Sequence, residues 1–434
     1  AVQRPVDHVR RQAGILAMRS PFSVLLGCVM RCVMRCVMRC VMGCVMGCAL
    51  GASLNAQITV RASTMLDGKG GVQRNVRITI EGSKIVRVDA DAKGPVSYDL
   101  TGLTLMPGWI DTHVHVNGHF NKDGRADNSG ESPAEFALRT EGTLWDTLQG
   151  GFTTVRSVGA NTDKEPRDLI AAGILPGPRI LTSLATFNEH SGTPEQIREK
   201  VRERVAQGAD VIKLFATASS RDGGAQTMSD AQIEAACSEA KALGRPAAVH
   251  AHASGGAKPA VLSGCTSIEH GTFLTDEALD LMAQRGVYLD PNLSNVPNYI
   301  NHKQAFLGLG NFTEQGFAEM AKDLPIRFNL IQRAMARKVM IVFGTDAVAG
   351  LPGHNSEEFI MRVHDGKQPP MDAIVSATSR AAQSIGLGSQ IGAIAPGMEA
   401  DLVATEGNPI DDITNVRKVI FVMKGGKVYK NSAR

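Results

Sequence analysis

The sequence predicts an α/β protein: a (β/α)8 TIM barrel with a small β-sandwich domain formed from both ends of the chain. Three observations support this prediction. Short apolar strands alternate with amphipathic helices through the middle of the chain, which is typical of a parallel sheet closed into a barrel. Segments with β-branched alternation stand at both ends. The chain has 434 residues, and since such a barrel needs roughly 250, a smaller second domain fits the remainder.

The domain boundaries follow from these patterns. Residues 57–107 and 391–434 are expected to build one composite β domain, and residues 108–390 the barrel. Within the barrel, the strand-like segments and the helical segments alternate. The strands are expected at 153–159, 209–217, 245–253, 266–273, 286–293 and 338–347. Helices are expected between them, including one at about 229–243 with Ser229 as its N-cap. The segment 294–330 has weak periodicity at its start and is either a lid or a helical insertion.

The composition is that of an ordinary globular protein. Hydrophobic residues make up 43% and charged residues 21% of the chain, and the net charge is only +3. Because no Lys/Arg-rich run is present, these values argue against nucleic acid as a partner. A small-molecule or dipeptide substrate is the better expectation.

Residues 1–56 are set apart as a signal or low-complexity segment. From Met18, which could be the true start, a basic residue is followed by an apolar stretch with repeated CVMR, and small residues precede Gln57. This order is similar to a secretory signal, so export to the periplasm or the medium is expected. Arginines at helical spacing interrupt the apolar run, which weakens the interpretation as a secretory signal or a membrane span. A lipid anchor, a disordered extension and a cytoplasmic protein remain alternatives.

Only two of the eight cysteines, Cys237 and Cys265, lie in the body of the chain, because the other six repeat every four residues within that first segment. The sequence after residue 56 therefore contains no CxxC zinc pattern, and no disulfide framework is predicted there. Cys265 is expected to be a small buried residue.

Side chains that can bind metal ions or catalyse a reaction lie at the C-terminal ends of the predicted strands, which is the catalytic face of such a barrel. His113 and His115 are two apart on one strand and point the same way, which makes half of a divalent-metal site. The pattern repeats at His250 and His252. His270 ends a further predicted strand, so five of the 11 histidines lie at such positions. Chance is a poor explanation for this placement. A surface His pair and a structural His at a strand end are the plain alternatives.

Two further residues extend this set. Lys213 lies inside an apolar strand, where an unpaired ammonium is costly. Carboxylation by CO2 would explain it, since a carbamate can bridge two metals, and a lysine paired to a carboxylate is the alternative. Asp346 ends a later strand, where it can ligate a metal and take a proton from the attacking water.

At this point the chain resembles the amidohydrolase superfamily, in its imidazolonepropionase-related branch with prolidase-like Xaa-dipeptidases and ochratoxin-type amidases. The matching stretches run in order from about 58 to 430 and are PGWIDTHVH, GFTTVRSVG, GADVIKLF, AAVHAHA, SIEHGTFL, VFGTDA and PGMEADLVA. The loop after HVH, Ser157, Asp290 and Asn292 depart from the branch and leave the substrate open.

The resemblance implies a site with two divalent metal ions, with zinc the expected element and Mn, Co or Fe possible substitutes. His113, His115 and Asp346 would bind the first ion, and His250 and His270 the second. Lys213 would bridge them as N6-carboxylysine. A hydroxide shared by the metals would attack the carbonyl, and Asp346 would pass its proton to the leaving nitrogen. His252 would contact the carbonyl or its oxyanion, with an orienting role as the alternative.

Substrate residues are less determined. Loop positions after strands suggest Tyr288, Asn292 and His354, with Tyr299 and Arg221 as further candidates. Analogy with similar enzymes suggests a homo-oligomer.

The sequence predicts a metal-dependent hydrolase of carbon–nitrogen bonds. One substrate class is favoured, and three alternative functions remain open. That class is dipeptides or N-acyl amino acids with a free carboxylate. The alternatives are an amidase or carbamate hydrolase for a xenobiotic such as an ochratoxin-like amide, a deaminase, and a non-catalytic binding barrel. The last is disfavoured, since a binding module has no need of a carboxylatable lysine.

Overall fold

In a computed structural model of the chain, residues 57–90 and 93–433 are described. The expected N-terminal signal or low-complexity segment, residues 1–56, lies outside them. The α/β fold predicted from the sequence is confirmed. No helix in the described part of the chain is long and apolar enough to cross a bilayer.

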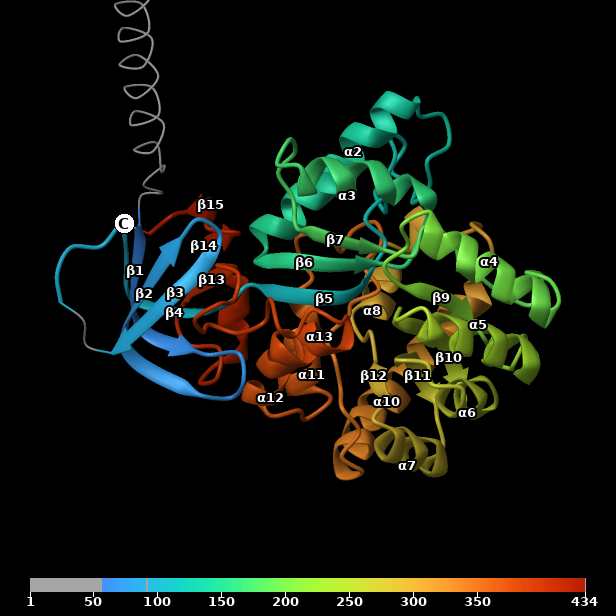
Figure 1. The fold of residues 1–434 in the computed structure, drawn as a ribbon. Coiled ribbons are helices and arrows are strands. Elements are labelled where there is room, and N and C mark those ends of the chain that lie inside the picture. Colours follow the sequence, from blue (N-terminus) through green and yellow to red (C-terminus); the bar gives the residue numbers. More distant parts are fainter. Residues whose placement is uncertain (1–56, 91–92, 434) are drawn as a thin grey trace, which may run out of the picture. The chain divides into compact units, whose positions relative to one another are not determined.

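Strands from the two ends of the described chain form one seven-stranded sheet (Figure 1). Its order is β15-β14-β13-β4-β1-β2-β3. The strands are β1 (Ile58–Leu66), β2 (Val72–Glu81), β3 (Lys84–Ala90), β4 (Tyr98–Pro107), β13 (Leu402–Glu406), β14 (Val419–Lys424) and β15 (Lys427–Asn431). Antiparallel pairing of β4 with β13, with Thr104 opposite Thr405, joins the early strands to the late ones.

One face of this sheet buries an apolar core that draws on both groups of strands. Val60, Ile78 and Leu105 from the early strands share a cluster with Leu402 and Phe421 from the late ones, and all are fully buried. Alternation along each strand places every second side chain on this face. The sheet thus depends on both ends of the described chain.

The barrel strands are parallel and belong to two sheets, with orders β5-β6-β7 and β12-β11-β10-β9-β8. They are β5 (Trp109–Val114), β6 (Phe152–Ser157), β7 (Arg179–Thr182), β8 (Thr186–Phe187), β9 (Ile212–Phe215), β10 (Ala247–Ala253), β11 (Ser267–Phe273) and β12 (Tyr288–Asp290). Because the strands are parallel, their C-terminal ends face the same side.

The strand expected at 338–347 is not a regular strand, which corrects the prediction. The segment makes two isolated parallel bridges, Leu289 to Ile341 and Val114 to Ala347. It therefore lies between β12 and β5 and connects the free edges of the two barrel sheets. Asp346 adopts a left-handed backbone with φ 54°, which breaks the extended run that a longer strand would need.

Helices follow the barrel strands as predicted. They are α2 (Pro133–Gln149), α3 (Lys164–Ala171), α4 (Pro194–Ala206), α5 (Asp230–Ala242), α6 (Ser254–Leu262), α7 (Asp276–Arg285), α8 (Asn295–Asn301), α9 (Lys303–Phe306), α10 (Glu314–Ala336), α11 (Glu357–His364), α12 (Pro370–Ser376) and α13 (Ser379–Ser384). Ser229 caps α5 by accepting a hydrogen bond from the Gln232 backbone, as predicted. The segment 294–330 is a helical insertion, made of α8, α9 and the first part of α10.

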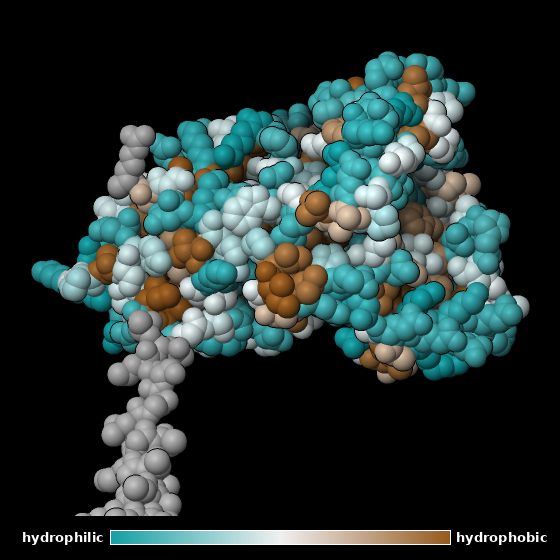
Figure 2. Space-filling view, turned by 90° about the horizontal axis from the view of Figure 1, so that it is seen from above, coloured by the Kyte–Doolittle hydropathy of each residue, from teal (hydrophilic) through white to brown (hydrophobic). Residues whose placement is uncertain are grey.

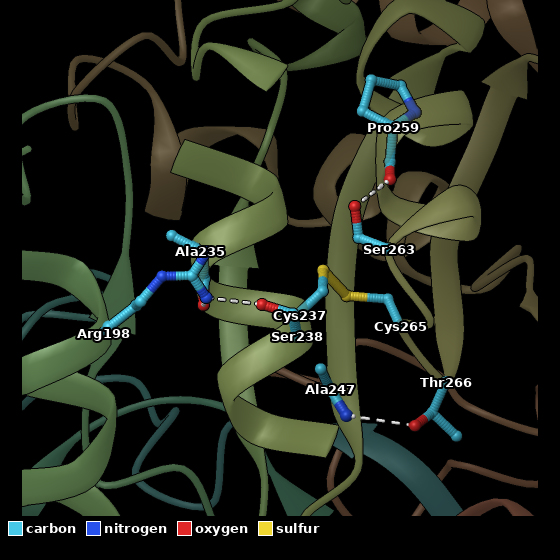
Figure 3. The surroundings of a disulfide bond; sticks show 9 residues. All are labelled: Arg198, Ala235, Cys237, Ser238, Ala247, Pro259, Ser263, Cys265 and Thr266. Carbon is cyan, nitrogen blue, oxygen red and sulfur yellow. Dashed lines mark hydrogen bonds between the residues drawn. A yellow bond between two sulfur atoms is a disulfide. The ribbon is translucent and has the colours of Figure 1, made fainter. Parts of the chain in front are cut away.

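A disulfide joins Cys237 and Cys265, whereas the sequence predicted no disulfide framework in the body (Figure 3). Cys237 lies on α5, and Cys265 lies two residues before β11. Their Cα atoms are 5.0 Å apart, within the range that a disulfide spans. Both residues are buried, as expected for Cys265. The prediction failed because the sequence, in which the two cysteines are 28 positions apart, gives no sign that α5 packs beside the turn that leads into β11.

The face of the molecule in Figure 2 is largely hydrophilic, with apolar residues in small separate groups. Exposed large apolar side chains include Leu138 and Ile174, which are 74% and 67% exposed. Isolated residues of this kind are normal on a soluble surface and do not mark a docking site.

Candidate metal centre

The side chains singled out in the sequence converge at the C-terminal ends of the barrel strands. They line a cavity of about 250 Å³. His113 comes from β5, Lys213 from β9, His250 and His252 from β10, and His270 from β11. His115 directly follows β5, and Asp346 lies within the bridging segment 338–347. Parallel strands deliver these residues to one place from more than two hundred residues of sequence.

His113, His115 and Asp346 form the first cluster of possible metal ligands, with ligand atoms all within 4.8 Å of one another. Asp346 Oδ1 lies 3.0 Å from His115 Nε2 and 3.3 Å from His113 Nε2. Burial raises the pKa of Asp346, but the nearby His113 and His115 outweigh it, so the pKa stays below its usual range. The carboxylate is therefore anionic, as a metal ligand must be.

His250, His252 and His270 form the second cluster, again within 4.8 Å. Burial lowers the pKa of His250 to about 3 and holds those of His252 and His270 well below the usual value. The rings are therefore neutral at pH 7 and offer lone pairs. His270 Nδ1 is buried without a hydrogen-bond partner among the described residues. An orphaned ring nitrogen beside two others fits a divalent metal ion.

Lys213 is buried and lines the same cavity as both clusters. Its Nζ is 3.5 Å from His113 Nε2, and in the described part of the chain no carboxylate lies within 4.0 Å of it to make an ion pair. Burial lowers its pKa to about 8. The alternative of a lysine paired to a carboxylate is thus not seen.

A buried network that the sequence reasoning missed orients His113. Because a carboxylate can only accept, His113 Nδ1 donates to Glu269 Oε2 at 2.7 Å, which leaves Nε2 facing the cavity. Glu269 also accepts from Arg156 at 3.2 Å and from Ser267. Burial raises the pKa of Glu269, but Arg156 and His113 outweigh it and lower it to about 2. Charged residues inside apolar strands were the signal for this network.

The backbone is strained at the site itself. His270 and Asp346 adopt left-handed conformations, with φ of 68° and 54°. Such conformations persist in non-glycine residues where the surroundings hold them, and they gather at functional sites. Here Asn292 Oδ1 accepts from the His270 backbone at 3.3 Å, and Asn295 donates to Asp346 Oδ2 at 2.7 Å.

The expected substrate residues divide into two groups. His252, Tyr299 and Arg221 line the cavity. Tyr288, Asn292 and His354 do not, which corrects their assignment.

Each of the three lies elsewhere for a physical reason. Tyr288 begins β12, so it lies at the end of the strand away from the site. Asn292 is fully buried, and its amide bonds Asp290 and the His270 backbone. His354 is exposed and lines a different cavity, beside Asp146.

Two arginines, Arg221 and Arg327, line the cavity and bring positive charge to its wall. Arg327 of α10 is buried and donates to Ser220 Oγ at 3.2 Å and to Asn295 Oδ1 at 3.4 Å. Arg221 lies over the Phe312 ring at 4.1 Å. Among the described residues, neither guanidinium has a carboxylate within 4.0 Å. Arg327 was not predicted, because α10 is remote from every strand end in sequence.

Comparison with known proteins places this geometry in context. The model of the amidohydrolase family matches residues 104–429, three quarters of the chain. The ochratoxinase of Aspergillus niger is 27% identical over 425 residues, which cover 86% of each protein.

Solved structures show a similar likeness. A Xaa-Pro dipeptidase with methionine bound in its active site is 30% identical, with a TM-score of 0.78 and coverage of 87% of this chain and all of that one. A prolidase in complex with N-methylphosphonate-L-proline is 27% identical, with the same TM-score and coverage. The resemblance inferred from the sequence motifs is confirmed.

Proposed function

Because the chain belongs to the amidohydrolase family and is a hydrolase of carbon–nitrogen bonds, we propose that it is a binuclear enzyme that cleaves the amide bond of dipeptides or N-acyl amino acids. The observation that carries the proposal is the meeting of two ligand clusters in one cavity that Lys213 also lines.

We assign His113, His115 and Asp346 to one divalent ion, and His250 and His270 to the other. Lys213, carboxylated on Nζ, would bridge them. A buried amine with a pKa of about 8 and no carboxylate partner supports this role, because CO2 reacts with the neutral amine. Bound metal ions would lower the pKa of a water molecule and polarise the substrate carbonyl. Zinc suits the imidazole and carboxylate ligands best.

The chain's own groups complete the reaction. Asp346 Oδ1 takes the proton of the attacking water and delivers it to the leaving nitrogen, while Asn295 holds Oδ2 at 2.7 Å. His252 Nδ1 is engaged with Thr272 Oγ1 at 2.9 Å, so that its Nε2 is free for the developing oxyanion.

The free carboxylate of the substrate is assigned to Arg221 and Arg327. Both guanidiniums line the cavity, and their lack of a carboxylate partner among the described side chains leaves their charge for a ligand. The relatives solved with methionine and with a proline phosphonate carry amino-acid ligands, which supports the same substrate class. The likeness to ochratoxinase favours a second candidate, an amidase for a xenobiotic amide.

The test is a metal analysis followed by a substrate panel. Two divalent ions per chain and hydrolysis confined to N-acyl amino acids and dipeptides are expected. Matched neutral amides should be inert, and Asp346→Asn should be inactive while keeping its fold. Activity on neutral amides or carbamates would favour the second candidate, ammonia release from cyclic amidines would indicate a deaminase, and a metal-free inert protein would indicate a binding barrel.

We also propose that the protein is exported and forms a homo-oligomer. A disulfide between two buried cysteines supports export, since such bonds persist in oxidising compartments. Fractionation of cells and light scattering of the purified protein test the two statements. Protein confined to the cytoplasm, or a monomer at all concentrations, would contradict them.

A further inference from the structure

A second cavity adjoins the first. Its volume is about 520 Å³, and His115 and Tyr299 line both cavities. The second cavity therefore begins beside His115, one of the three residues of the first ligand cluster. It lies in the size range of small-molecule sites, and nothing in the assignment of the metal ligands or of the arginines uses it.

The walls of this second cavity are mainly aromatic and aliphatic. Its apolar side chains come from α2, from the α8–α10 insertion and from the loop after Asp346, and they are Phe136, Tyr299, Phe306, Leu309, Phe312 and Val348. Tyr299 packs edge-on against the rings of Phe306 and Phe312, each at 4.9 Å between centroids. Aromatic walls of this kind bind flat apolar groups by burial and by ring–ring contact.

Two of the polar side chains on these walls, His119 and Asp127, make hydrogen bonds to neighbouring residues. His119 Nε2 lies 2.9 Å from Glu131, which also pairs with Arg139. Asp127 accepts from Ser129 and Asn121. The two cavities therefore differ in kind: the first has cations without carboxylate partners, whereas the second has mainly apolar walls, on which His119 Nδ1 is buried without a hydrogen-bond partner among the described residues.

The loop after β5 is fixed to the opposite wall. Arg125 donates to the backbone carbonyls of Gln304 at 2.5 Å and of Leu307 at 2.6 Å, and the Ala126 backbone donates to that of Ala305 at 3.0 Å. These bonds hold the cavity open before a ligand arrives, which lowers the cost of binding.

We propose that the second cavity binds the acyl group of the substrate and selects bulky, uncharged aromatic acyl groups. The proposal rests on the proposed function, which places the scissile carbonyl between the two ligand clusters. With the carboxylate of the leaving amino acid at Arg327 and at Arg221, which also contacts the Phe312 ring, the acyl group would lie past His115 and Tyr299, the two residues that line both cavities.

The experiment compares acyl groups on one leaving amino acid, the one that the metal-loaded full chain hydrolyses fastest. Acetyl, phenylacetyl, 2-naphthylacetyl and succinyl derivatives are used, because each has a CH2 or CH3 group beside the carbonyl and a similar intrinsic reactivity. We expect kcat/KM for the two aryl groups to exceed that for acetyl by at least about tenfold, and succinyl to be the poorest.

Phe136→Ala, which removes one wall of the second cavity, should reduce the aryl-to-acetyl ratio of kcat/KM about fivefold. Leu138→Ala is the matched control, because it lies on the same helix but is 74% exposed. It should leave the ratio unchanged. Leu309→Trp, which narrows the cavity, should penalise naphthylacetyl most.

The two ideas fail in different ways. A flat acyl profile, a preference for acetyl or succinyl, or a ratio that Phe136→Ala does not alter overturns the acyl-site proposal and leaves amide hydrolysis standing. Absence of hydrolysis with every acyl group and every leaving amino acid overturns both.

Discussion

Glu269 offers a sharp test of how the site is held, because it lines neither of the two cavities described above and yet orients His113. Its carboxylate accepts from three donors, His113 Nδ1, Arg156 and Ser267, at 2.7, 3.2 and 2.5 Å. Glu269→Gln keeps the shape but exchanges one acceptor oxygen for an NH2 group. If that NH2 group faces His113, the imidazole ring must carry its proton on Nε2. The Nε2 lone pair is then not available to bind a metal ion. If it faces Arg156, two donors oppose each other.

The size of the effect follows from this geometry. Loss of an orienting partner costs about 10- to 100-fold in metal affinity, or roughly 1.4–2.8 kcal/mol. The buried Arg156 guanidinium loses its charge partner, so the free energy of unfolding of the apoprotein should fall by about 3 kcal/mol.

The assay is chelator competition for zinc, with thermal unfolding measured on the same samples. Glu234→Gln is the matched control, since it removes a carboxylate paired with Arg198 on the surface. It should change neither quantity measurably. If folded Glu269→Gln bound zinc as tightly as the parent protein, the orienting role would be refuted.

The remaining predictions concern the bridge, its pH dependence and the disulfide. Lys213→Met should reduce the bound metal from two ions per chain to one or none and abolish hydrolysis, measured by elemental analysis; two retained ions would contradict the bridging role. With a pKa of about 8, against 10.5 for an ordinary lysine, roughly a quarter of the Lys213 amines are neutral at pH 7.5 instead of about one in a thousand. Activation of the apoprotein by zinc and bicarbonate should therefore accelerate as pH rises from 6.5 to 8.5, and a flat rate would count against carboxylation. Cys237→Ala with Cys265→Ala should lower the free energy of unfolding by about 3–4 kcal/mol, from the 28-residue separation. Its kcat at 25 °C should stay within about twofold, since both cysteines lie away from the cavity, and an unchanged melting temperature would show that the bond does not stabilise the fold.

The positions of the seven principal site residues could be predicted because parallel strands bring their C-terminal ends to one face. Apolar periodicity located the strands, so His113, Lys213 and His270 could be placed together without knowledge of their contacts. The sequence singles out Lys213 because a charge inside an apolar strand is costly. The same reasoning applied to Arg156 and Glu269 would have revealed the network behind His113.

Other features depend on contacts that strand order does not specify. The strand β12 is only three residues long, Tyr288–Asp290. Tyr288 is its first residue and therefore lies at the end of the strand away from the site. Arg327 reaches the cavity from the middle of a 23-residue helix. The Cys237–Cys265 bond requires the packing of α5 beside β11. Local pattern fixes neither the ends of a short strand nor the approach of a helix from outside the barrel.

The most direct measurement is a crystal structure of the metal-loaded protein, with anomalous scattering used to locate the ions. We expect two peaks, one among His113, His115 and Asp346 and the other among His250 and His270, with density for a carboxyl group on Lys213 Nζ reaching toward both. A bare Lys213 ammonium with no ion on either side of it would contradict the central claim.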